Sequence, residues 1–489
     1  MTTFGQKRNA VWCFGDKSGI DFNALNSPVP IVSALNTRGS STSICDTSGQ
    51  LLFYSAYDTT SIISGTDPVT IYNRNHVVMS NGDSMKGGVG YNEEVIIPDP
   101  ANTNLFYFFH IGVTLFFGIF YSIVDISHNG GLGVVTQKNI QLQTFANVDC
   151  LNAIKHGNGR DWWVIFRESG GTPGNPNSDF YQYLITPAGI SNVSAQNVGS
   201  TNSTNLGKIT FSKSGDKMIY NSYRGMIELY DYNRCTGIIS NPITLFQETI
   251  LPPYNHFWGS EFSPDGSKLY VTISDQTSYL FQFDLNAPNI AGSIDTLWST
   301  NFPGEAIGGL KRGPDGKIYE SGPYTSPPFF VYPYPDRVYN MYNMNLGIIN
   351  SPDSLGAACD FQPYSFYLGG KSTYWGLPNN PDYDLGPLIG SSCDSLTAVQ
   401  ENVLNNTNAT LNLYYHPGWK TLFVNAQNLK GTKGTIKIYD TQGNIIYTSL
   451  CGIQPPYFTK DIALPGLAQG VYVVQLQTEK EILNGKFVK

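Results

Sequence analysis

Apolar and polar positions alternate in a unit that recurs along about the first 390 residues. The clearest copies are residues 262–271 (FSPDGSKLYV), 211–220 (FSKSGDKMIY) and 311–319 (KRGPDGKIY). Each copy joins a short apolar run, a tight turn that contains glycine, and an alternating run that ends in an aromatic residue. Because such turns need a residue that tolerates positive φ, each copy predicts a β-hairpin.

Weaker copies of the unit lie at residues 45–54, 96–109, 153–166 and 361–374, so that seven turns follow one another about 50 to 57 residues apart. A further alternating run follows each hairpin, as in the sequence LFQFDL at residues 280–285. About four strands per repeat is typical of a propeller blade. The pattern therefore predicts an all-β chain that begins with a seven-bladed β-propeller at residues 9–389.

The seventh repeat lacks two strands, because after Tyr374 the chain is too rich in proline and asparagine to form them. Residues 9–34 contain two β-like runs that have no hairpin of their own. We predict that they complete the last blade and close the ring, which removes the open sheet edges. This closure would bring Cys13 near Cys359, and these two are our candidates for a disulfide. Residues 1–8 are interpreted either as the remnant of a signal peptide region or as residues added to the N-terminus of the natural sequence.

A second domain is predicted after residue 408, where the repeat has ended. Seven short strands follow within about 80 residues, and they include TLFVNA, GTIKIYD and GVYVVQLQT. Turn sequences such as DTQG separate them. This pattern predicts a small Ig-like antiparallel β-sandwich at residues 409–489, joined to the propeller by a linker at residues 390–408.

Composition and charge argue against several classes of protein. The chain has 29 Lys and Arg against 37 Asp and Glu, a net charge of −8, and no basic run that could follow a phosphate backbone, so no nucleic-acid partner is expected. Only 13% of the residues are charged, against roughly 25% in an average domain. Residues 105–123 are uncharged and long enough to cross a bilayer, but their aromatic and β-branched residues predict two strands and no transmembrane segment.

The last domain resembles the C-terminal sorting domain of proteins exported by the type IX secretion system of Bacteroidota. The resemblance rests on the sequences KIYDTQG, LAQGVY and KFVK. It implies that the type IX secretion machinery carries the protein through the outer membrane, so that the protein is secreted or held on the outer cell surface. The residues that match the sorting motif are Tyr439, Asp440, Gly443, Gly470, Tyr472, Lys486, Phe487 and Lys489.

The propeller resembles those of many surface and secreted proteins of the same bacteria, through stretches such as GQLLFYS, IYNRNHVVMSNG and GLPNNPDYDLGP. These bacteria glycosylate exported proteins at Asp-Ser/Thr-apolar or Asp-Ser/Thr-Thr triplets, and four triplets of this chain resemble that pattern. The resemblance therefore implies candidate O-glycosylation sites at Thr59, Thr296, Ser354 and Ser395.

Residues with catalytic or metal-binding chemistry are few and scattered. The six histidines lie in six separate segments without the spacing of a metal site, so neither a metal nor another cofactor is predicted. Glu93, Glu94 and Glu261 lie at the start of predicted inner strands, where paired carboxylates could act on a sugar as they do in glycosidases. We favour hydrogen bonding to neighbouring blade loops for these groups, and no catalytic residue is assigned.

A ligand of the propeller is expected at the mouth of the channel or on the loops around it. Aromatic rings beside cationic and amide groups there suit a carbohydrate or an acidic peptide. The candidate ligand-binding residues are Arg74, His76, Arg167, Tyr223, Arg224, Trp258, Glu261 and Lys311.

Two hypotheses about function follow from the sequence. The first is a non-enzymatic exported protein whose propeller serves in binding, adhesion or assembly. Its partner would be itself, as a homo-oligomer or filament, or a surface glycan or protein, and the low charge suits such contact because few charges must lose water. The alternative is a secreted polysaccharide hydrolase or lyase that acts in the propeller channel.

Overall fold

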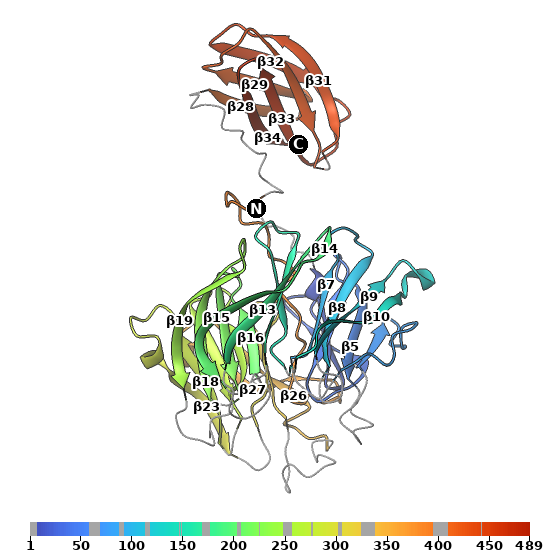
Figure 1. The fold of residues 1–489 in the computed structure, drawn as a ribbon, viewed down its shortest axis with the longest axis vertical. Coiled ribbons are helices and arrows are strands. Elements are labelled where there is room, and N and C mark those ends of the chain that lie inside the picture. The colour runs from blue at the N-terminus through green and yellow to red at the C-terminus, as the bar shows by residue number, and fades with distance from the viewer. Residues whose placement is uncertain are drawn as a thin grey trace. The chain divides into compact units, whose positions relative to one another are not determined.

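The computed structural model describes residues 7–57, 69–87, 92–112, 118–145, 147, 149–168, 177–202, 207–223, 225–247, 257–274, 277–301, 306–323, 338–394, 409–441 and 443–489. The chain divides into two compact units, Met1–Cys393 and Asp394–Lys489, here called the propeller unit and the sandwich unit. Figure 1 shows that both are built from strands, which confirms the predicted all-β class.

Seven sheets make up the described part of the propeller unit, and strands that pair within a sheet are antiparallel. The first three sheets are β1 (Val11–Phe14), β2 (Asp16–Asp21) and β3 (Val29–Asn36); β4 (Ser41–Cys45), β5 (Leu51–Tyr57) and β6 (Val69–Asn73); and β7 (Glu94–Pro98), β8 (Leu105–Gly112), β9 (Gly118–Asp125) and β10 (Val134–Gln143). The fourth consists of β11 (Asn152–Lys155), β12 (Trp162–Arg167), β13 (Asn177–Thr186), β14 (Gly189–Ile190) and β15 (Ser194–Asn202).

The last three sheets of the propeller unit have four strands each. They are β16 (Gly207–Phe211), β17 (Lys217–Ser222), β18 (Met226–Asn233) and β19 (Ile238–Gln247); β20 (Phe257–Phe262), β21 (Lys268–Ile273), β22 (Thr277–Asp284) and β23 (Asp295–Asn301); and β24 (Leu310–Arg312), β25 (Ile318–Ser321), β26 (Asn345–Ile349) and β27 (Phe361–Tyr367).

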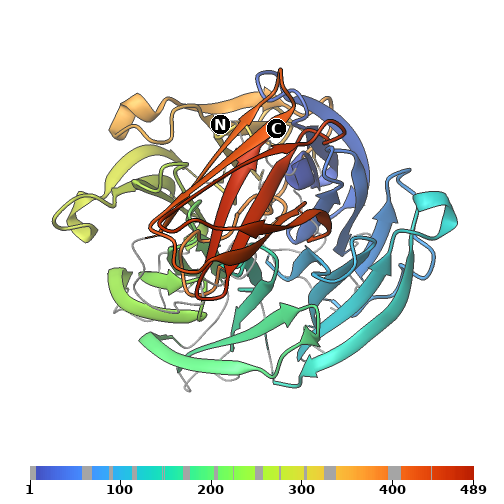
Figure 2. The same ribbon diagram turned by 90° about the horizontal axis from the view of Figure 1, so that it is seen from above.

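These sheets follow one another around a common centre, as in a β-propeller (Figure 2). The inner strands of successive sheets, from β4 through β7, β11, β16 and β20 to β24, lie next to one another. The turn between β20 and β21 illustrates why the repeated sequence folds this way. Gly266 there has a φ of +74°, and its N–H donates to Ser263 O at 3.0 Å. A residue with a β-carbon would be strained at this φ, which explains the glycine of the repeat.

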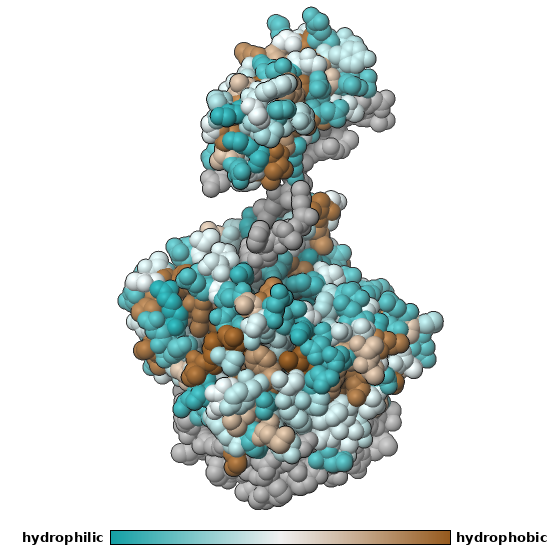
Figure 3. All heavy atoms as spheres, turned by 180° about the vertical axis from the view of Figure 1, so that it is seen from behind, coloured by the Kyte–Doolittle hydropathy of each residue, from teal (hydrophilic) through white to brown (hydrophobic). Residues whose placement is uncertain are grey.

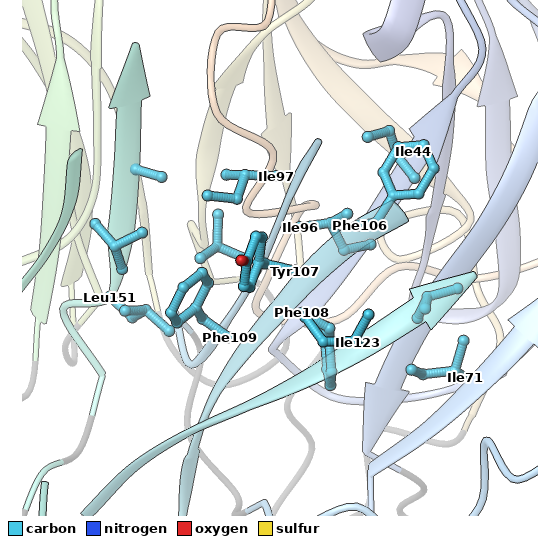
Figure 4. Packing of buried hydrophobic residues seen from close by; sticks show 14 of the residues in the cluster. Ile44, Ile71, Ile96, Ile97, Phe106, Tyr107, Phe108, Phe109, Ile123 and Leu151 are labelled. Carbon is cyan, nitrogen blue, oxygen red and sulfur yellow. The ribbon is translucent and has the colours of Figure 1, made fainter. Parts of the chain in front are cut away.

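Sheet-on-sheet packing buries most of the propeller strands on both faces. Figure 4 shows one cluster of apolar side chains that joins the second, third and fourth sheets. Ile96, Phe106 and Phe108 are fully buried in it. Residues 105–123 contribute β8 and the first part of β9, so the prediction of two strands there is confirmed. In the part of the chain that the structure describes, no helix is long and apolar enough to cross a membrane.

The ends of the ring meet differently from the predicted arrangement. Residues 361–367 form β27, the outer strand of the sheet that begins at β24, and not the first strand of a new hairpin. The N-terminal strands β1, β2 and β3 form a sheet of their own. They join the C-terminal side where the Asp16 N–H and the Ser18 hydroxyl donate to Ser372 O at 2.9 and 2.7 Å. The Trp12 ring packs edge-on against Tyr319 at 5.7 Å between centroids, so the first and last sheets also meet through side chains.

The sandwich unit has the two antiparallel sheets that its sequence pattern predicts. One contains β28 (Thr410–His416), β29 (Thr421–Gln427) and β32 (Tyr457–Ala463), and the other contains β31 (Ile445–Gly452), β30 (Lys433–Tyr439), β33 (Val471–Thr478) and β34 (Ile482–Val488), in these orders. Alternate side chains of both sheets are buried between them, among them Leu422, Ile436 and Val474. The period-two pattern of the sequence is therefore the pattern of the core.

Candidate functional site

Residues 375–388, here called the central segment, cross the middle of the propeller unit and bind its inner strands. The Asn379 amide donates to Glu94 O at 3.1 Å and to Leu151 O at 2.7 Å. The Asn380 side-chain oxygen accepts from the Ser43 N–H at 2.9 Å. One short stretch of amides thus bonds to the second, third and fourth sheets at their inner strands.

Hydrogen bonds from the other side of the ring hold the same segment. The Trp258 indole N–H donates to Trp375 O at 2.9 Å, and Lys311 Nζ donates to Asn380 O. On the first side, the buried Tyr383 hydroxyl adds a bond to the third sheet, where it donates to Ile96 O at 2.8 Å. Polar groups that would otherwise face an open channel therefore have the central segment as their partner.

Two carboxylates of the central segment lie near cations of the inner strands and of the turns that follow them. Asp382 Oδ2 is 2.8 Å from Lys213 Nζ and 3.5 Å from an Arg312 guanidinium nitrogen. Burial alone would raise the pKa of Asp382, but these two cations outweigh it, and the pKa lies below its ordinary value. Partial burial of its carboxyl group and then the negative charge of Asp382 raise the pKa of Asp384, although the residue as a whole is exposed. The pKa of Asp382 is therefore lower than that of an ordinary aspartate, and the pKa of Asp384 is higher.

A cavity of about 140 Å³ opens beside these carboxylates. Inner strands and turns of the last four sheets of the propeller unit line it, together with Asn9 and the central segment. Its charged side chains are Lys213, Glu261, Lys311, Arg312, Asp382 and Asp384. Asp384 is exposed, whereas Asp382 is held in the ion pairs described above. This cavity is the candidate functional site.

Two further carboxylates of the propeller strands, those of Glu94 and Glu320, are enclosed rather than open to a ligand. Glu94 is 1% exposed, accepts a hydrogen bond from the Ser55 hydroxyl at 2.5 Å, and has its pKa raised by burial to about 8. Glu320, also 1% exposed, accepts from the Gly308 N–H at 3.2 Å, and burial raises its pKa to about 8 as well. Glu261 accepts from the Arg312 N–H at 3.0 Å. Glu94 and Glu261 thus bond to residues of neighbouring sheets.

The cysteine pairing differs from the predicted one. Cys235 and Cys393 form a disulfide, whereas Cys13 and Cys359 are buried free thiols. The predicted pair is wrong because the two residues belong to separate apolar clusters, one beside β4 and β5 and the other beside β24 and β25. The observed disulfide instead connects the turn after β18 with the chain just beyond the central segment.

The residues of the predicted sorting motif meet at one end of the sandwich unit. The Gly470 N–H donates to Lys489 O at 3.3 Å, and the Lys489 N–H donates to Gly470 O at 3.0 Å. The Tyr472 ring stacks on Phe487 at 5.4 Å, and its hydroxyl donates to Ala468 O at 2.9 Å. The last strand is thereby fixed to the LAQGVY sequence.

The other motif residues form the turn between β30 and β31 or lie beside it. The Gly443 N–H donates to Asp440 O at 3.1 Å, and Gly443 has a φ of +84°. Tyr439 ends β30, and Lys486 is exposed on β34. Residues 412–489 match the family described as secretion system C-terminal sorting domain.

Residues 412–489 are a secretion system C-terminal sorting domain. The sorting domain shows that the protein is a substrate of the type IX secretion system and is exported to the cell surface or the extracellular space. The predicted resemblance and localisation are confirmed, and the described part of the sandwich unit, residues 409–489, is called the sorting domain below.

Solved structures similar to the chain are β-propeller proteins of several kinds. A putative 6-phosphogluconolactonase from Bacteroides fragilis has a TM-score of 0.45 and 11% identity, over 75% of this chain and 96% of that one. The periplasmic gluconolactonase PpgL of Pseudomonas aeruginosa has a TM-score of 0.36 and 12% identity, over 84% and 100%. The β-propeller domain of Myceliophteria thermophila Cps50 (Swd1) has a TM-score of 0.34 and 11% identity, over 64% and 92%. The sequence matches none of the curated proteins with which it was compared.

The candidate ligand-binding residues do not converge on one site. Glu261 and Lys311 line the cavity. Arg74 and His76 lie instead in the turn after β6, on the outer side of the second sheet, where His76 Nδ1 contacts the Tyr54 hydroxyl at 2.8 Å. Arg167 is 1% exposed and its guanidinium lies over the Tyr220 ring at 4.3 Å.

Tyr223 and Trp258 are brought together elsewhere, with 5.4 Å between their ring centroids, and Trp258 packs on Trp375 at 4.8 Å. Arg224 lies outside the described residues. The charged residues of the cavity that the sequence reasoning missed are Lys213, Arg312, Asp382 and Asp384. The two aspartates were hidden in a Pro/Asn-rich stretch without strand periodicity, although its buried aromatic residues Trp375 and Tyr383 were a signal that it belongs inside the propeller.

Two of the four candidate glycosylation sites can be placed. Thr296 is exposed on β23, an outer strand, and Ser354 is half-buried in the connection between β26 and β27. Thr59 and Ser395 lie outside the described residues. Among the described side chains, no group of three or more His, Cys, Asp or Glu could hold a metal ion.

Proposed function

We propose that this protein is a non-enzymatic protein of the outer cell surface or extracellular medium, whose propeller binds a protein or glycan partner in adhesion or assembly. The central segment is the observation that supports this proposal. In an open ring the inner strands could present polar groups to a substrate. Here those groups bind residues 375–388 instead, through Asn379, Asn380 and Tyr383. A partner would therefore bind to the faces of the ring and not to its inner strands.

The cavity beside Asp382 and Asp384 is the proposed binding site on one of these faces. Its volume of about 140 Å³ corresponds to roughly five water molecules, so it has room for a single polar group of a larger partner. Lys213 is half-exposed and Asp384 is exposed, so a donor and an acceptor are both within reach of such a group. The surrounding turns would contact the remainder of the partner.

The surface of the propeller suits contact with another macromolecule. Figure 3 shows apolar patches between areas of intermediate and hydrophilic character on the face that it displays. Charged residues make up only 13% of the chain, so little charge must lose water when such a surface is covered. This composition supports adhesion or self-assembly more than the capture of a strongly charged ligand.

A second candidate function, a secreted polysaccharide hydrolase or lyase, is supported by the two aspartates. Their pKa values are shifted apart, that of Asp384 upward and that of Asp382 downward. Such a pair can divide into a general acid and a base. We rank this enzymatic function second because the Asp382 carboxylate already forms ion pairs with Lys213 and Arg312.

Binding and hydrolysis can be separated with one set of variants. The purified full chain is added to Bacteroidota cells and to a panel of insoluble polysaccharides, and both the bound protein and the released sugars are measured. Under the proposal, Lys213→Ala and Asp384→Asn lower binding at least tenfold, and no preparation releases sugar. The matched control is Asp83→Asn, which changes a carboxylate whose side chain is 66% exposed in another part of the propeller.

The two functions predict different results from this experiment. Sugar release that Asp384→Asn abolishes would establish the enzyme. Binding that is equally strong in Lys213→Ala, Asp384→Asn and the control would move the binding surface away from the cavity. Wild-type protein that binds neither the cells nor any polysaccharide would contradict the adhesive role.

A further inference from the structure

The sorting domain is basic, although the chain as a whole is acidic. Residues 409–489 contain eight lysines against two aspartates and two glutamates. Residues 1–408 contain 21 Lys and Arg against 33 Asp and Glu. The domain that directs export therefore has a charge opposite to that of the protein that it carries.

Three of these lysines share the outer face of the sheet formed by β31, β30, β33 and β34. On β30, Lys433 and Lys437 alternate with the buried residues Ile436 and Ile438. On β34, Lys486 precedes the buried residue Phe487 and points the opposite way. No aspartate or glutamate occupies an outward position on these four strands, and none of the three lysines forms an ion pair with a described residue. We call this surface the basic face.

The outer face of the other sheet is different. Its strands β28, β29 and β32 present no outward lysine. Tyr414 and Phe423, which stack at 6.2 Å, and the acidic residue Asp461 lie in one cross-strand row there. The positive charge is therefore a property of one face and not of the whole sorting domain.

Apart from Asp440 and Gly443, which belong to the turn between β30 and β31, the sorting-motif residues divide between the interior and the basic face. Tyr472 and Phe487 are buried, and Gly470 and Lys489 bond to each other through the backbone. In contrast, Tyr439 and Lys486 stand in one cross-strand row on the basic face, on either side of Val473. Two motif side chains within the strands, those of Tyr439 and Lys486, are thus accessible to another molecule on the basic face, and the partly exposed Asp440 follows Tyr439 in the turn.

We propose that the basic face is the surface by which the sorting domain docks on the secretion machinery, and that its partner there is an acidic protein surface. Three unpaired lysines without a carboxylate among them attract a negatively charged partner and disfavour a positive one. Exposed apolar residues of the same face, including Leu450 and Val488 at 82% and 60% exposure, would supply the apolar part of the interface. The internal motif residues hold this face in shape.

The proposal is tested by export of the full chain, placed behind a signal peptide, in a Bacteroidota strain with an active type IX system. Lys437→Glu/Lys486→Glu reverses two charges on the basic face. Lys420→Glu/Lys430→Glu makes the same change in net charge at two exposed lysines outside the sheet strands, one in the turn between β28 and β29 and one in the loop after β29. We expect the first variant to fall at least tenfold in exported protein, with accumulation in the periplasm, and the second to be exported like the wild type.

Further variants keep the test decisive. Lys437→Arg/Lys486→Arg retains the charge and should restore export. Melting of each purified full chain shows whether it is folded, and if the charge reversal unfolds the domain, Lys437→Gln/Lys486→Gln replaces it. Normal export of the basic-face variants, or an equal loss in both charge-reversed pairs, overturns the proposal. Variants that are exported but no longer retained on the cell also overturn it, because the face would then bind an anionic glycolipid of the cell surface. The outcome does not depend on what the propeller binds.

Discussion

The disulfide between Cys235 and Cys393 gives the sharpest test of how the central segment is held. It connects residues 158 positions apart, and Cys393 follows the central segment by only five residues. Breaking the crosslink restores freedom to a long loop of the unfolded chain. For a loop of this length the loop-entropy relation gives about 5 kcal/mol at 25 °C. Cys393→Ser should therefore lower the free energy of unfolding of the propeller unit by up to about 5 kcal/mol.

This loss can be converted into a melting temperature. The propeller unit extends over 393 residues, for which the entropy of unfolding is about 0.8 kcal/mol/K, so the melting temperature should fall by about 6 °C. Calorimetry is the assay, because it resolves the propeller from the sorting domain. The Arg234 guanidinium still donates to Gly386 O at 2.7 Å, and the Leu388 N–H to Gly157 O at 2.7 Å, so the native ring should remain closed.

Reduction provides the internal control for this prediction. Adding a reductant should lower the melting temperature of the wild type by the same amount, and should leave Cys393→Ser unchanged. Cys451→Ser, which removes a half-buried free thiol of the sorting domain, should not alter the propeller transition. If peptide mapping shows the Cys235–Cys393 bond and its reduction shifts the transition by less than about 1 °C, the reasoning about loop entropy is refuted.

Two further predictions concern a buried acid and the sorting domain. Burial raises the pKa of Glu94 from 4.5 to about 8, so its contribution to stability is complete below about pH 4.5 and is lost as the pH rises to 8, because the unfolded chain gives up the proton first. The melting temperature of Glu94→Gln relative to wild type should thus rise between pH 5 and 8, and a constant difference would contradict this pKa. Phe487→Ala removes a buried ring that stacks on Tyr415 and Tyr472, and should destabilise the sorting domain by about 3 to 5 kcal/mol in calorimetry. Val488→Ala, at a position 60% exposed, is its control, and an equal loss in both variants would argue against the packing role.

Local patterns in the sequence predict the strands well. The FSPDG and FSKSG turns give hairpins because a glycine with positive φ and a following alternating run are sufficient to define them, as Gly266 and Gly215 show with φ values of +74° and +76°. The sorting domain follows the same logic, since every second residue from Ile436 to Ile438 or from Tyr472 to Leu476 enters its core. The turn and the alternating run that define each hairpin lie within about ten consecutive residues, so the hairpins can be predicted from the sequence alone.

The pairing of distant segments could not be predicted in the same way. Cys235 and Cys393 come together because the central segment crosses the ring and ends beside the turn after β18, and no spacing in the sequence reveals this path. The prediction that Arg167 belongs to a ligand-binding site fails for a related reason. Arg167 has the chemistry of a ligand-binding residue, but it points between two sheets onto Phe180 and Tyr220, and only the packing of those sheets shows it.

The central segment also explains why an inner-strand carboxylate is poor evidence for catalysis in this propeller. A general acid or base must reach a substrate proton within hydrogen-bond distance, and the open space around it must admit the substrate. Glu94 lies beneath Ser55 and is 1% exposed, and the backbone beside it is bonded to Asn379. Its raised pKa therefore follows from burial, in a ring whose inner backbone is bonded to the central segment. A perturbed pKa supports a functional role here only where a cavity adjoins it, and Asp384 is the group that satisfies both conditions.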